Sequence, residues 1–259
     1  MGKGWTFRLG RLALAAGAVA AMAGCTPAPK DGTLIADPYE ATNRRIHELN
    51  KGLDTGLVEP GSRLYEAVTP TLVTFLVRNG ISNLELPVYA ANQLLQGRPL
   101  DALSTAGRFG LNTVFGAAGL LDPATEFGLP LKRADFGETL FVWGVQEGAY
   151  IELPFLGPSS ERDAFGVLVD YLMNPTTYFT GFVVESPTTE ILLGLRGTDI
   201  LAFRAENADL IDQLYYESSD SYTEVKNAYV QLRRRELGVE TTPEDALPDI
   251  FEDPADPQQ

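Results

Sequence analysis

Apolar residues in this chain come in short runs, and this limits what it can fold into. Beyond an N-terminal apolar segment, the longest runs cover only residues 72–77 and 114–121. A helix that crosses a bilayer needs about 20 consecutive, mostly apolar residues. We therefore expect no transmembrane helix in the body of the chain. The pattern instead predicts a mainly α-helical single domain built from many short amphipathic helices.

The N-terminus has the layout of a secretory signal. Three basic residues precede an uncharged, alanine-rich run over residues 12–22, and small residues then lead to Cys25. The run is about half the length needed to span hydrocarbon, so it predicts a cleaved segment rather than an anchor. Small residues before a cysteine also form a lipoprotein cleavage box. We predict a lipoprotein signal peptide at residues 1–24 and a lipidated linker at residues 25–36.

Cleavage before Cys25 would free its amine and thiol for acylation. Two or three acyl chains anchor a protein firmly, since each buried methylene contributes about 0.8 kcal/mol. The alternative is an ordinary cleaved signal followed by a chance cysteine. Cys25 is the only cysteine in the sequence, which excludes an internal disulfide and a site made of several thiolates.

The charge of the chain is strongly acidic. Without residues 1–24 it has 17 lysines and arginines against 35 acids, a net charge of −18. This argues against nucleic acid as a partner, because nucleic-acid binding needs a basic surface. Residues 239–259 are acidic and proline-rich, so we predict a disordered acidic tail there. The tail is either an inert solvated segment or a docking segment for a basic partner.

Hydrophobic periodicity and capping signals predict the helices. They run from Pro38 to about Leu53, Pro70 to Arg78, Pro87 to Gln96, Pro99 to Phe115, Ser160 to Met173, Pro187 to Tyr216 and Tyr222 to Leu237. Ser160 is the predicted N-cap of its helix, and Gly238 the predicted stop of the last one. Between residues 116 and 158 recurrent glycines and prolines interrupt an aromatic-rich stretch. This stretch predicts a compact, irregular, glycine-rich loop region that can contain short strands.

Motifs for catalysis, cofactors and metals are missing from the sequence. Its one histidine, His47, excludes histidine-rich metal sites, and its predicted helix face is exposed, so we expect it to be solvated. There is no nucleophile elbow, no Walker lysine and no dinucleotide fingerprint. A lipid hydrolase would need a nucleophile with a base, and we identify neither. The sequence therefore predicts a protein that is not an enzyme and uses no cofactor.

Six segments in order resemble one known family, the MlaA (VacJ) outer-membrane phospholipid-transport lipoproteins. They start at Asp37-Pro38, Arg78-Asn79-Gly80, Asn92-Gln93, Arg108-Phe109, Asp135-Phe136-Gly137 and Leu153-Pro154, and Arg162-Asp163 follows them. The likeness predicts a family domain over residues 37–238. The chain departs from the family at Ala41-Thr42, where an aromatic is usual, and at Glu138, where glutamine is common. The family motif residues, structural or channel-lining, are Asp37, Pro38, Asn43, Arg44, Asn79, Gly80, Asn83, Asn92, Gln96, Gly97, Arg108, Phe109, Asn112, Phe136, Gly137, Thr139, Pro154, Gly157, Arg162 and Asp163.

The resemblance implies a fold, a place and a function. The fold is a doughnut-like disc in the inner leaflet of the outer membrane, with a central amphipathic channel. The place is the periplasmic face, with anchoring through Cys25. The function is to remove mislocalised phospholipids from the outer leaflet and pass them to a periplasmic MlaC-like lipid carrier, beside an outer-membrane porin trimer. The alternative function is that of a structural adaptor that binds porins without transferring lipid.

Two residue-level questions stay open from sequence. Arg108 either meets a lipid phosphate, with amides such as Asn92, Gln96 and Asn112 lining the channel, or these residues cap helices and satisfy buried backbone groups. Gly137, Gly144 and Gly148 suit either a bending loop that gates the channel or simple tight turns.

Overall fold

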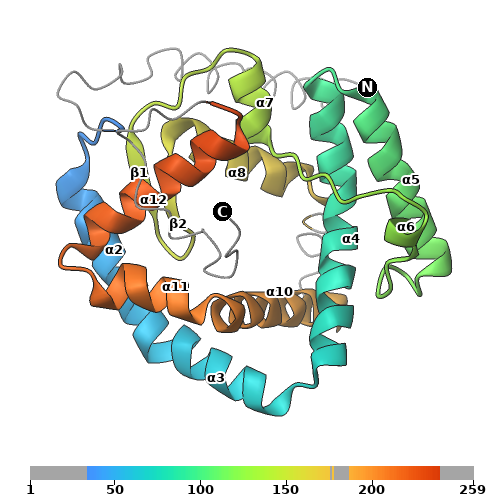
Figure 1. Ribbon diagram of the computed structural model, residues 1–259, viewed down its shortest axis with the longest axis horizontal. Helices are drawn as coiled ribbons and strands as arrows, with labels where there is room; N and C mark the ends of the chain where they lie inside the picture. Colours follow the sequence, from blue (N-terminus) through green and yellow to red (C-terminus); the bar gives the residue numbers. More distant parts are fainter. Residues whose placement is uncertain (1–33, 176, 178–186, 240–259) are drawn as a thin grey trace, which may run out of the picture.

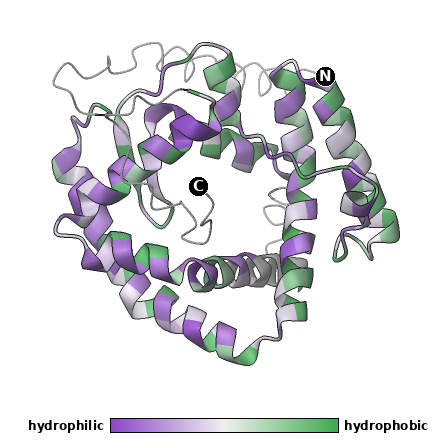
Figure 2. Ribbon diagram, in the orientation of Figure 1, coloured by the Kyte–Doolittle hydropathy of each residue, from purple (hydrophilic) through white to green (hydrophobic). Residues whose placement is uncertain are grey.

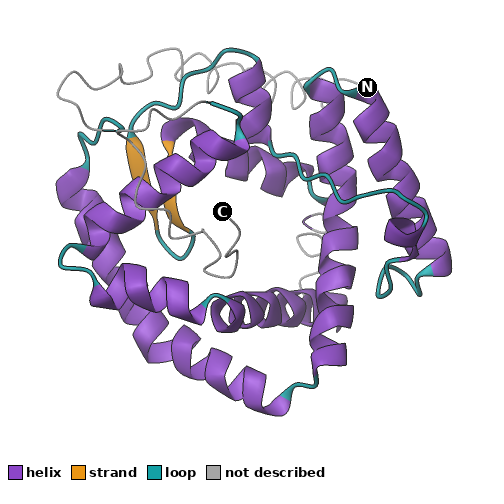
Figure 3. Ribbon diagram, viewed as in Figure 1, coloured by secondary structure: helices purple, strands orange, loops and turns teal. Residues whose placement is uncertain are grey.

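The computed structural model describes residues 34–175, 177 and 187–239 of the chain. The predicted signal peptide, Cys25, most of the predicted linker and nearly all of the acidic tail lie outside the described residues. Within the described part the chain is mainly helical and carries one antiparallel two-stranded hairpin (Figure 1, Figure 3). This confirms the predicted mainly α class and the single domain.

The described elements are helices, two short π-helical turns and the hairpin. In chain order they are α2 (Glu40–Leu53), η1 (Asp54–Val58), α3 (Glu59–Val68), α4 (Thr71–Leu95), α5 (Pro99–Phe115), α6 (Pro123–Glu126), α7 (Phe136–Val142), β1 (Tyr150–Leu153), β2 (Gly157–Ser160), α8 (Glu161–Met173), α10 (Pro187–Glu206), α11 (Ala208–Asp212), η2 (Gln213–Glu217) and α12 (Ser221–Glu236). None of the helices in the described ranges is both long and apolar enough to cross a membrane.

The elements follow one another around a common centre (Figure 1). From α2 the chain passes through α3 to α4, while α7 packs on α8 at the other end of α4. The return path runs through α12, η2 and α11, and α10 closes it by packing on both α3 and α4. We call this arrangement of α2, α3, α4, α7, α8, α10 and α12 the helical frame. α5 packs along α4 on the outer side of the frame, with α6 beside it.

α4 is one continuous helix of 25 residues where the sequence predicted two. The predicted break at Gly80 is wrong, because this glycine lets the chain after α5 approach closely: a Cβ added there would lie 3.4 Å from Leu120 Cδ2. Asn79 donates a side-chain hydrogen bond to the carbonyl of the same leucine, 3.2 Å away. Pro87 lies inside the helix and removes one backbone donor. Packing against α5 therefore outweighs two local break signals.

The stretch from residue 116 to residue 158 is more ordered than predicted. Its short strands are confirmed, with Tyr150 paired to Ser160 and Leu153 to Gly157. It also holds α6 and α7, which the sequence analysis missed, and Asp135 caps α7 by accepting a hydrogen bond from the Glu138 amide at 2.8 Å. Gly144 and Gly148 adopt positive φ angles of 87° and 75°, Gly144 in the turn that follows α7, whereas Gly137 is helical.

Several other boundaries match or correct the predictions. α5 has the predicted bounds, and α8 ends at the predicted Met173 with Ser160 as its N-cap, its side chain accepting from the Asp163 amide at 3.1 Å. α12 lies within one residue of its predicted range, and Gly238 follows it at φ 68°. The predicted helix from Pro187 to Tyr216 is instead interrupted at Asn207. η1 and α3 had no counterpart in the sequence analysis.

The folded domain starts before the predicted boundary at residue 37. Ile35 is only 2% exposed and packs with Tyr150, Tyr222 and Val230. A backbone hydrogen bond also connects this segment to β1: the Tyr150 amide donates to the Ala36 carbonyl at 2.8 Å. The last residues of the predicted linker are thus part of the core.

Candidate functional site

In the described part of the chain many polar side chains are buried beside the apolar core, and many large apolar side chains are exposed, which partly inverts the usual distribution of polarity. Fully buried positions include Asn43, His47, Asn92, Gln93, Thr139 and Glu152. Large apolar residues that are 60% or more exposed occur on several helices and loops: Leu57, Leu64, Val68, Leu72, Leu94, Leu100, Leu103, Val114, Phe115, Phe127, Phe155 and Leu156. Figure 2 shows apolar positions scattered over the outer helices, α5 among them. Leu100 and Leu103 lie one turn apart on α5 and are 81% and 71% exposed, and an exposed apolar helix face of this kind suits contact with an apolar phase or partner.

α2 shows the same inversion within one helix. The sequence pattern placed Ile46, Leu49 and Leu53 on its inner face, but Leu49 is 49% exposed. The buried residues of α2 are Asn43 and His47. The prediction that His47 is solvated is therefore wrong, because the polar face of this helix points inward.

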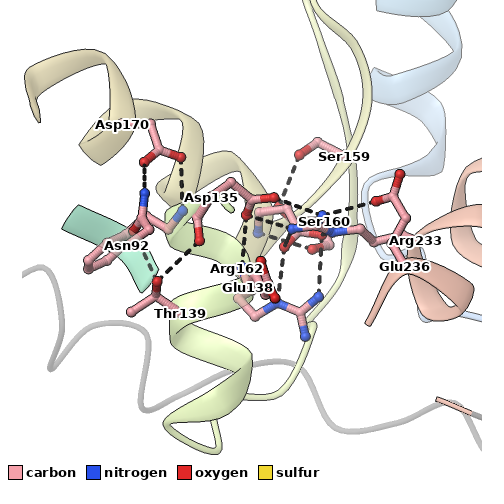
Figure 4. Close-up of polar contacts among 12 residues, drawn as sticks. Asn92, Asp135, Glu138, Thr139, Ser159, Ser160, Arg162, Asp170, Arg233 and Glu236 are labelled. Atoms are coloured by element: carbon pink, nitrogen blue, oxygen red, sulfur yellow. Dashed lines mark hydrogen bonds and ion pairs between the residues drawn. The ribbon is translucent and has the colours of Figure 1, made fainter. Parts of the chain in front are cut away.

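One buried network joins α4, α7, α8 and α12, and we call it the seam network. It comprises Asn92, Gln96, Asp135, Thr139, Arg162, Asp163, Asp170 and Arg233. Figure 4 labels six of these: Asn92, Asp135, Thr139, Arg162, Asp170 and Arg233. At its α4 end, Asn92 Nδ2 donates to Asp170 Oδ1 at 2.7 Å, and Asn92 Oδ1 accepts from the Thr139 hydroxyl at 2.9 Å. Asp170 also accepts from the Phe136 amide at 2.9 Å. A single amide of α4 thus fixes the positions of α7 and α8.

Gln96 extends the seam network at the end of α4. Its Nε2 donates to the Thr139 hydroxyl at 3.1 Å, and its Oε1 accepts from Arg98 at 3.1 Å. Gly97 follows at φ 73°, a backbone conformation that suits glycine at a helix end. The motif residues Asn92, Gln96, Gly97 and Thr139 are therefore brought together in one place.

Arg233 forms the other end of the seam network, on α12. Its Nη2 lies 2.7 Å from Asp135 Oδ1, and its Nε lies 3.1 Å from Asp163 Oδ2. Asp163 also accepts from Arg162 Nε at 3.0 Å and from the Tyr229 hydroxyl at 2.7 Å. These bonds tie the last helix of the domain to α7 and α8.

Charge and burial shift the seam carboxyl groups in opposite directions. Burial alone would raise the pKa of Asp163, but the charges and hydrogen bonds of Arg233 and Arg162 outweigh it, so the pKa lies below its ordinary value. Burial raises the pKa of Asp170, with no arginine bonded to it to offset the effect. Burial and then the nearby Asp135 charge raise the pKa of Glu138.

Two glycines let α7 and α8 meet at van der Waals distance. A Cβ on Gly166 would lie 2.4 Å from the backbone nitrogen of Gly137, and a Cβ on Gly137 would lie 2.4 Å from Asp163 Oδ1. Neither position has room for any side chain. Gly137 is thus a packing residue, which supplies a physical reason for its place in the motif.

Arg108, on α5, binds the segment that follows this helix. It is 6% exposed, and its guanidinium donates to Asp122, to the Leu129 carbonyl and to the Thr125 hydroxyl, the last at 2.9 Å. Burial tends to raise the pKa of Asp122, but hydrogen bonds from Thr125 and Asn112 and the Arg108 charge lower it overall. These contacts favour the structural alternative for Arg108 over the phosphate contact.

Asn112 and Asn83 act in the same region. Asn112 donates to Asp122 Oδ1 and accepts from the Ala124 amide, both at 3.0 Å. Asn83 Nδ2 donates to the Thr113 hydroxyl at 3.1 Å and so joins α4 to α5. The partly buried Phe109 lies beside them on α5. With Arg108 and Asn79, these two asparagines hold α4, α5 and the following loop together.

A third polar cluster connects α2 to the hairpin and to α12, and we call it the α2 junction. Asn43 Nδ2 donates to the Tyr150 carbonyl, and its Oδ1 accepts from the Glu152 amide, both at 3.0 Å. Asp37 accepts from Asn43 at 3.0 Å and from Lys226 at 2.9 Å. Arg44 binds both oxygens of Asp220, at 2.8 and 3.0 Å. The first and last described helices are joined here.

Pro154 lies in the hairpin turn, Gly157 is the first residue of β2, and Pro38 precedes α2. Pro154 and Pro38 are exposed, and Gly157 has a φ of 80°. Sequence reasoning missed His47, Asn50, Glu152 and Arg233 as network residues. The signal it could have used is that charged and amide residues fall on one face of α2 opposite Leu49.

A cavity of about 390 Å³ lies beside the seam network. Phe141, Val145 and Leu237 contribute apolar wall, and Arg162 and Arg234 contribute charged groups. Both guanidinium groups are engaged by carboxylates, Arg162 by Asp163 and Arg234 by Glu147. Among the described residues, no cluster of histidine, cysteine, aspartate and glutamate could hold a metal ion.

A model of the MlaA lipoprotein family matches residues 35–236, which is nearly the whole described domain. The chain belongs to the MlaA lipoprotein family. It is similar to proteins named intermembrane phospholipid transport system lipoprotein MlaA. The Shigella flexneri protein is 32% identical over 214 residues, covering 81% of this chain and 82% of the relative. The Haemophilus influenzae protein is 31% identical over 200 residues, covering 75% and 76%. An uncharacterized Rickettsia felis protein is 31% identical, covering 77% of each chain.

A solved structure supports the same assignment. It concerns the structural basis for maintenance of bacterial outer membrane lipid asymmetry and superposes with a TM-score of 0.65 at 30% sequence identity. The match covers 78% of this chain and 98% of the solved one. MlaA proteins are transport lipoproteins rather than enzymes, which agrees with the prediction made from the missing catalytic motifs.

The two departures from the MlaA pattern are accommodated locally. Ala41 and Thr42 are exposed, so the buried contacts of Asn43 do not depend on them. Glu138 accepts from Arg98 Nη1 at 3.1 Å and thereby gains an ion pair at the edge of the seam network.

Proposed function

We propose that this chain is an outer-membrane lipoprotein of retrograde phospholipid transport. It is anchored through Cys25 on the periplasmic face, removes mislocalised phospholipids from the outer leaflet, and passes them to a periplasmic MlaC-like carrier. The relatives named as intermembrane phospholipid transport lipoproteins support this proposal. The acyl chains on Cys25 would supply the firm attachment that a strongly acidic chain cannot obtain from anionic lipid headgroups.

The observation that carries the proposal is the inverted distribution of polarity. On α5 alone, Leu100, Leu103, Val114 and Phe115 are between 70% and 81% exposed. Moving one such side chain from water into hydrocarbon contributes about 1.5–3 kcal/mol. A set of such faces therefore favours immersion of the domain in one leaflet, where no helix needs to cross the bilayer.

In this proposal the helical frame is a doughnut-like disc with a wet passage through its middle. Apolar outer faces meet acyl chains, and the polar inner side receives the headgroup. The seam network, the Arg108 contacts and the α2 junction hold the frame in shape, since their polar groups are bonded to protein. The passage lets a phospholipid leave the outer leaflet without covalent chemistry. A porin trimer beside the disc would be the second partner.

Loss of the gene in its own host tests the proposal. We expect more phospholipid in the outer leaflet and greater sensitivity to detergent, both restored by the wild-type gene. An unchanged outer leaflet would remove the transport proposal. A Cys25→Ala variant gives a matched control, because it keeps the domain and removes the anchor.

Reconstitution separates transport from the adaptor alternative. Purified protein in proteoliposomes should deliver labelled phospholipid to a soluble MlaC-like carrier when porin is present. Intact porin binding with no lipid delivered would favour the adaptor. Release of free fatty acid by the purified protein would instead revive a hydrolase.

A further inference from the structure

The turn of the β hairpin holds a phenylalanine at a position that suits glycine. Phe155 has a φ of 66°, in the left-handed region, and it directly follows Pro154 in the turn. A turn with proline at its second position and a positive φ at its third favours glycine or asparagine there, because a bulky side chain strains the backbone. The other non-glycine residues with positive φ in the described ranges are Ala117 and Ala118. Phe155 is therefore the bulky exception within this part of the chain.

The fold gains little from the side chain that causes this strain. Phe155 is 79% exposed, and the next residue, Leu156, is 67% exposed. An apolar side chain stabilises a fold by leaving water, and these two side chains remain largely in water. Stability alone would thus favour glycine or asparagine at position 155. A strained residue that the fold does not need points to a role outside folding.

An asparagine of α2 fixes the turn in place. Asn50 Oδ1 accepts from the Phe155 amide at 2.8 Å, and Asn50 Nδ2 donates to the Leu153 carbonyl at 3.0 Å. The same Nδ2 lies 3.3 Å from Oε1 of the fully buried Glu152. One side chain therefore binds the turn and the end of β1, so that Phe155 and Leu156 are presented in a fixed position. Such preorganisation lowers the entropy that a contact with a ligand costs.

The turn lies on the inner side of the helical frame. β1 packs on α2 and β2 packs on α12, and the turn emerges past α12 toward the common centre of the helices (Figure 1). Residues of the strands behind the turn are polar and buried, among them Ser159 and Ser160. Phe155 and Leu156 thus form an exposed apolar end on this hairpin, and we call these two residues the hairpin tip. A ligand that meets the tip from the centre must offer apolar surface.

We propose that the hairpin tip binds the acyl chains of a phospholipid in transit. This inference rests on the proposed function, which places a phospholipid in the passage through the frame. Acyl chains have no polar atoms, so rigid apolar side chains can hold them without directional bonds, while polar groups of the passage meet the headgroup. Glycine or asparagine at position 155 would relieve the backbone but remove half of the tip. The strain at Phe155 is in this way the cost of an apolar contact for the lipid.

Photocrosslinking identifies what the tip touches. The full-length protein carries benzoylphenylalanine at position 155 in the membrane of its own host, and the irradiated protein is analysed for bound lipid and bound protein. We expect adducts with phospholipid at position 155 and none at the exposed polar position Glu48. Adducts with porin or with the carrier, or no adduct at all, would overturn the proposal.

Substitutions separate contact with lipid from folding. Phe155→Asn suits a positive φ, so the unfolding temperature should stay unchanged or rise by up to about 3 °C. Delivery of phospholipid from porin-containing proteoliposomes to the soluble MlaC-like carrier should nevertheless fall about fivefold or more, because apolar surface is lost. Phe155→Met keeps both the strain and an apolar side chain, so it should retain at least about half of the delivery. Glu48→Gln, on the exposed side of α2, is the control and should change neither quantity.

The outcomes distinguish this site from the proposed function. Wild-type protein that delivers no phospholipid would refute the proposed function itself. Delivery by the wild type that Phe155→Asn leaves unchanged would refute the hairpin tip alone. A clear fall in the unfolding temperature of Phe155→Asn would show that the fold needs the phenylalanine, and this too would refute the inference.

Discussion

Arg233 is the residue on which the seam network depends most. It binds Asp135 and Asp163, and it lies on α12, far along the chain from both partners. Its pKa is raised, because the charges of Asp135 and Asp163 outweigh the effect of its burial. When Arg233 is removed, the buried Asp163 keeps Arg162 as a partner, whereas Asp135, whose side chain is 43% exposed, is left to solvent.

Arg233→Gln should lower the free energy of unfolding by about 1–3 kcal/mol, since the buried Asp163 loses one of its two arginine partners and the partly exposed Asp135 loses an ion pair. Urea unfolding in detergent measures it. Arg63→Gln is the control: this arginine is 74% exposed and pairs with Glu59 one helical turn away, so we expect less than about 0.5 kcal/mol. Equal effects of the two substitutions would show that the seam network adds no more stability than a surface pair.

Asp163 makes the stability that the seam network contributes depend on pH. Its folded-state pKa is lowered, so its contribution is present above the unfolded value of about 3.9 and is lost as the pH falls through the folded value. Asp163→Asn should therefore destabilise the protein near neutral pH, and the difference should shrink as the pH falls below about 3.9. Chemical unfolding at neutral and at acid pH tests the sign. A larger effect in acid than at neutral pH would contradict it.

At the scale of elements, the fit of α7 against α8 depends on Gly137 and Gly166. The two backbones approach so closely that a Cβ on Gly166 would overlap backbone atoms, which cannot rotate away. Helical glycine normally weakens a helix by about 1 kcal/mol relative to alanine. Here the close contact between α7 and α8 offsets this loss of helix stability.

Gly166→Ala should thus destabilise the protein by about 1–3 kcal/mol or more, in spite of the better helix propensity of alanine. Gly52→Ala, on α2, is the matched control. Nothing lies within 4 Å of an added Cβ there, so alanine should stabilise the helix by up to about 1 kcal/mol. Thermal unfolding of the two variants measures the contrast. Effects of the same sign would show that the two sites do not differ in packing.

Elements with local start and stop signals could be predicted from sequence. α5, α8 and α12 are of this kind, with Pro99, Ser160 and Gly238 marking their ends. The length of α4 could not be predicted from sequence, because Gly80 and Pro87 are local signals for a helix break. Packing of α4 against α5 overrides both signals. The motif residues of the seam network could be listed from the sequence, but their mutual contacts could not. His47 was misplaced because periodicity finds the apolar face of a helix and does not say that this face points outward.

At the scale of the whole molecule, the described helices surround a centre (Figure 1), and many polar side chains are buried among them. The sequence that follows Val239 carries acids but no lysine or arginine. Such a segment suits a basic partner, and its attraction should depend on salt.

Cutting the chain after Gly238 should therefore weaken docking of the MlaC-like carrier, and high salt should weaken docking of the full chain to a similar degree. Surface binding measurements on porin-bound protein test both. A full-length control with each tail acid changed to its amide should behave like the truncation. Unaltered carrier affinity would mean that the tail is an inert solvated segment.

The claim on which the account rests is that the outer apolar faces of the helical frame and of α5, which packs on it, lie in lipid. The most direct measurement places a fluorophore on a single added cysteine at Leu103, which is 71% exposed on α5, in protein held in a bilayer of acyl-brominated phospholipid. We predict strong quenching by the bromine at Leu103 and weak quenching at the exposed polar position Glu48. Equal, weak quenching at the two positions, with both open to a water-soluble quencher, would contradict the account.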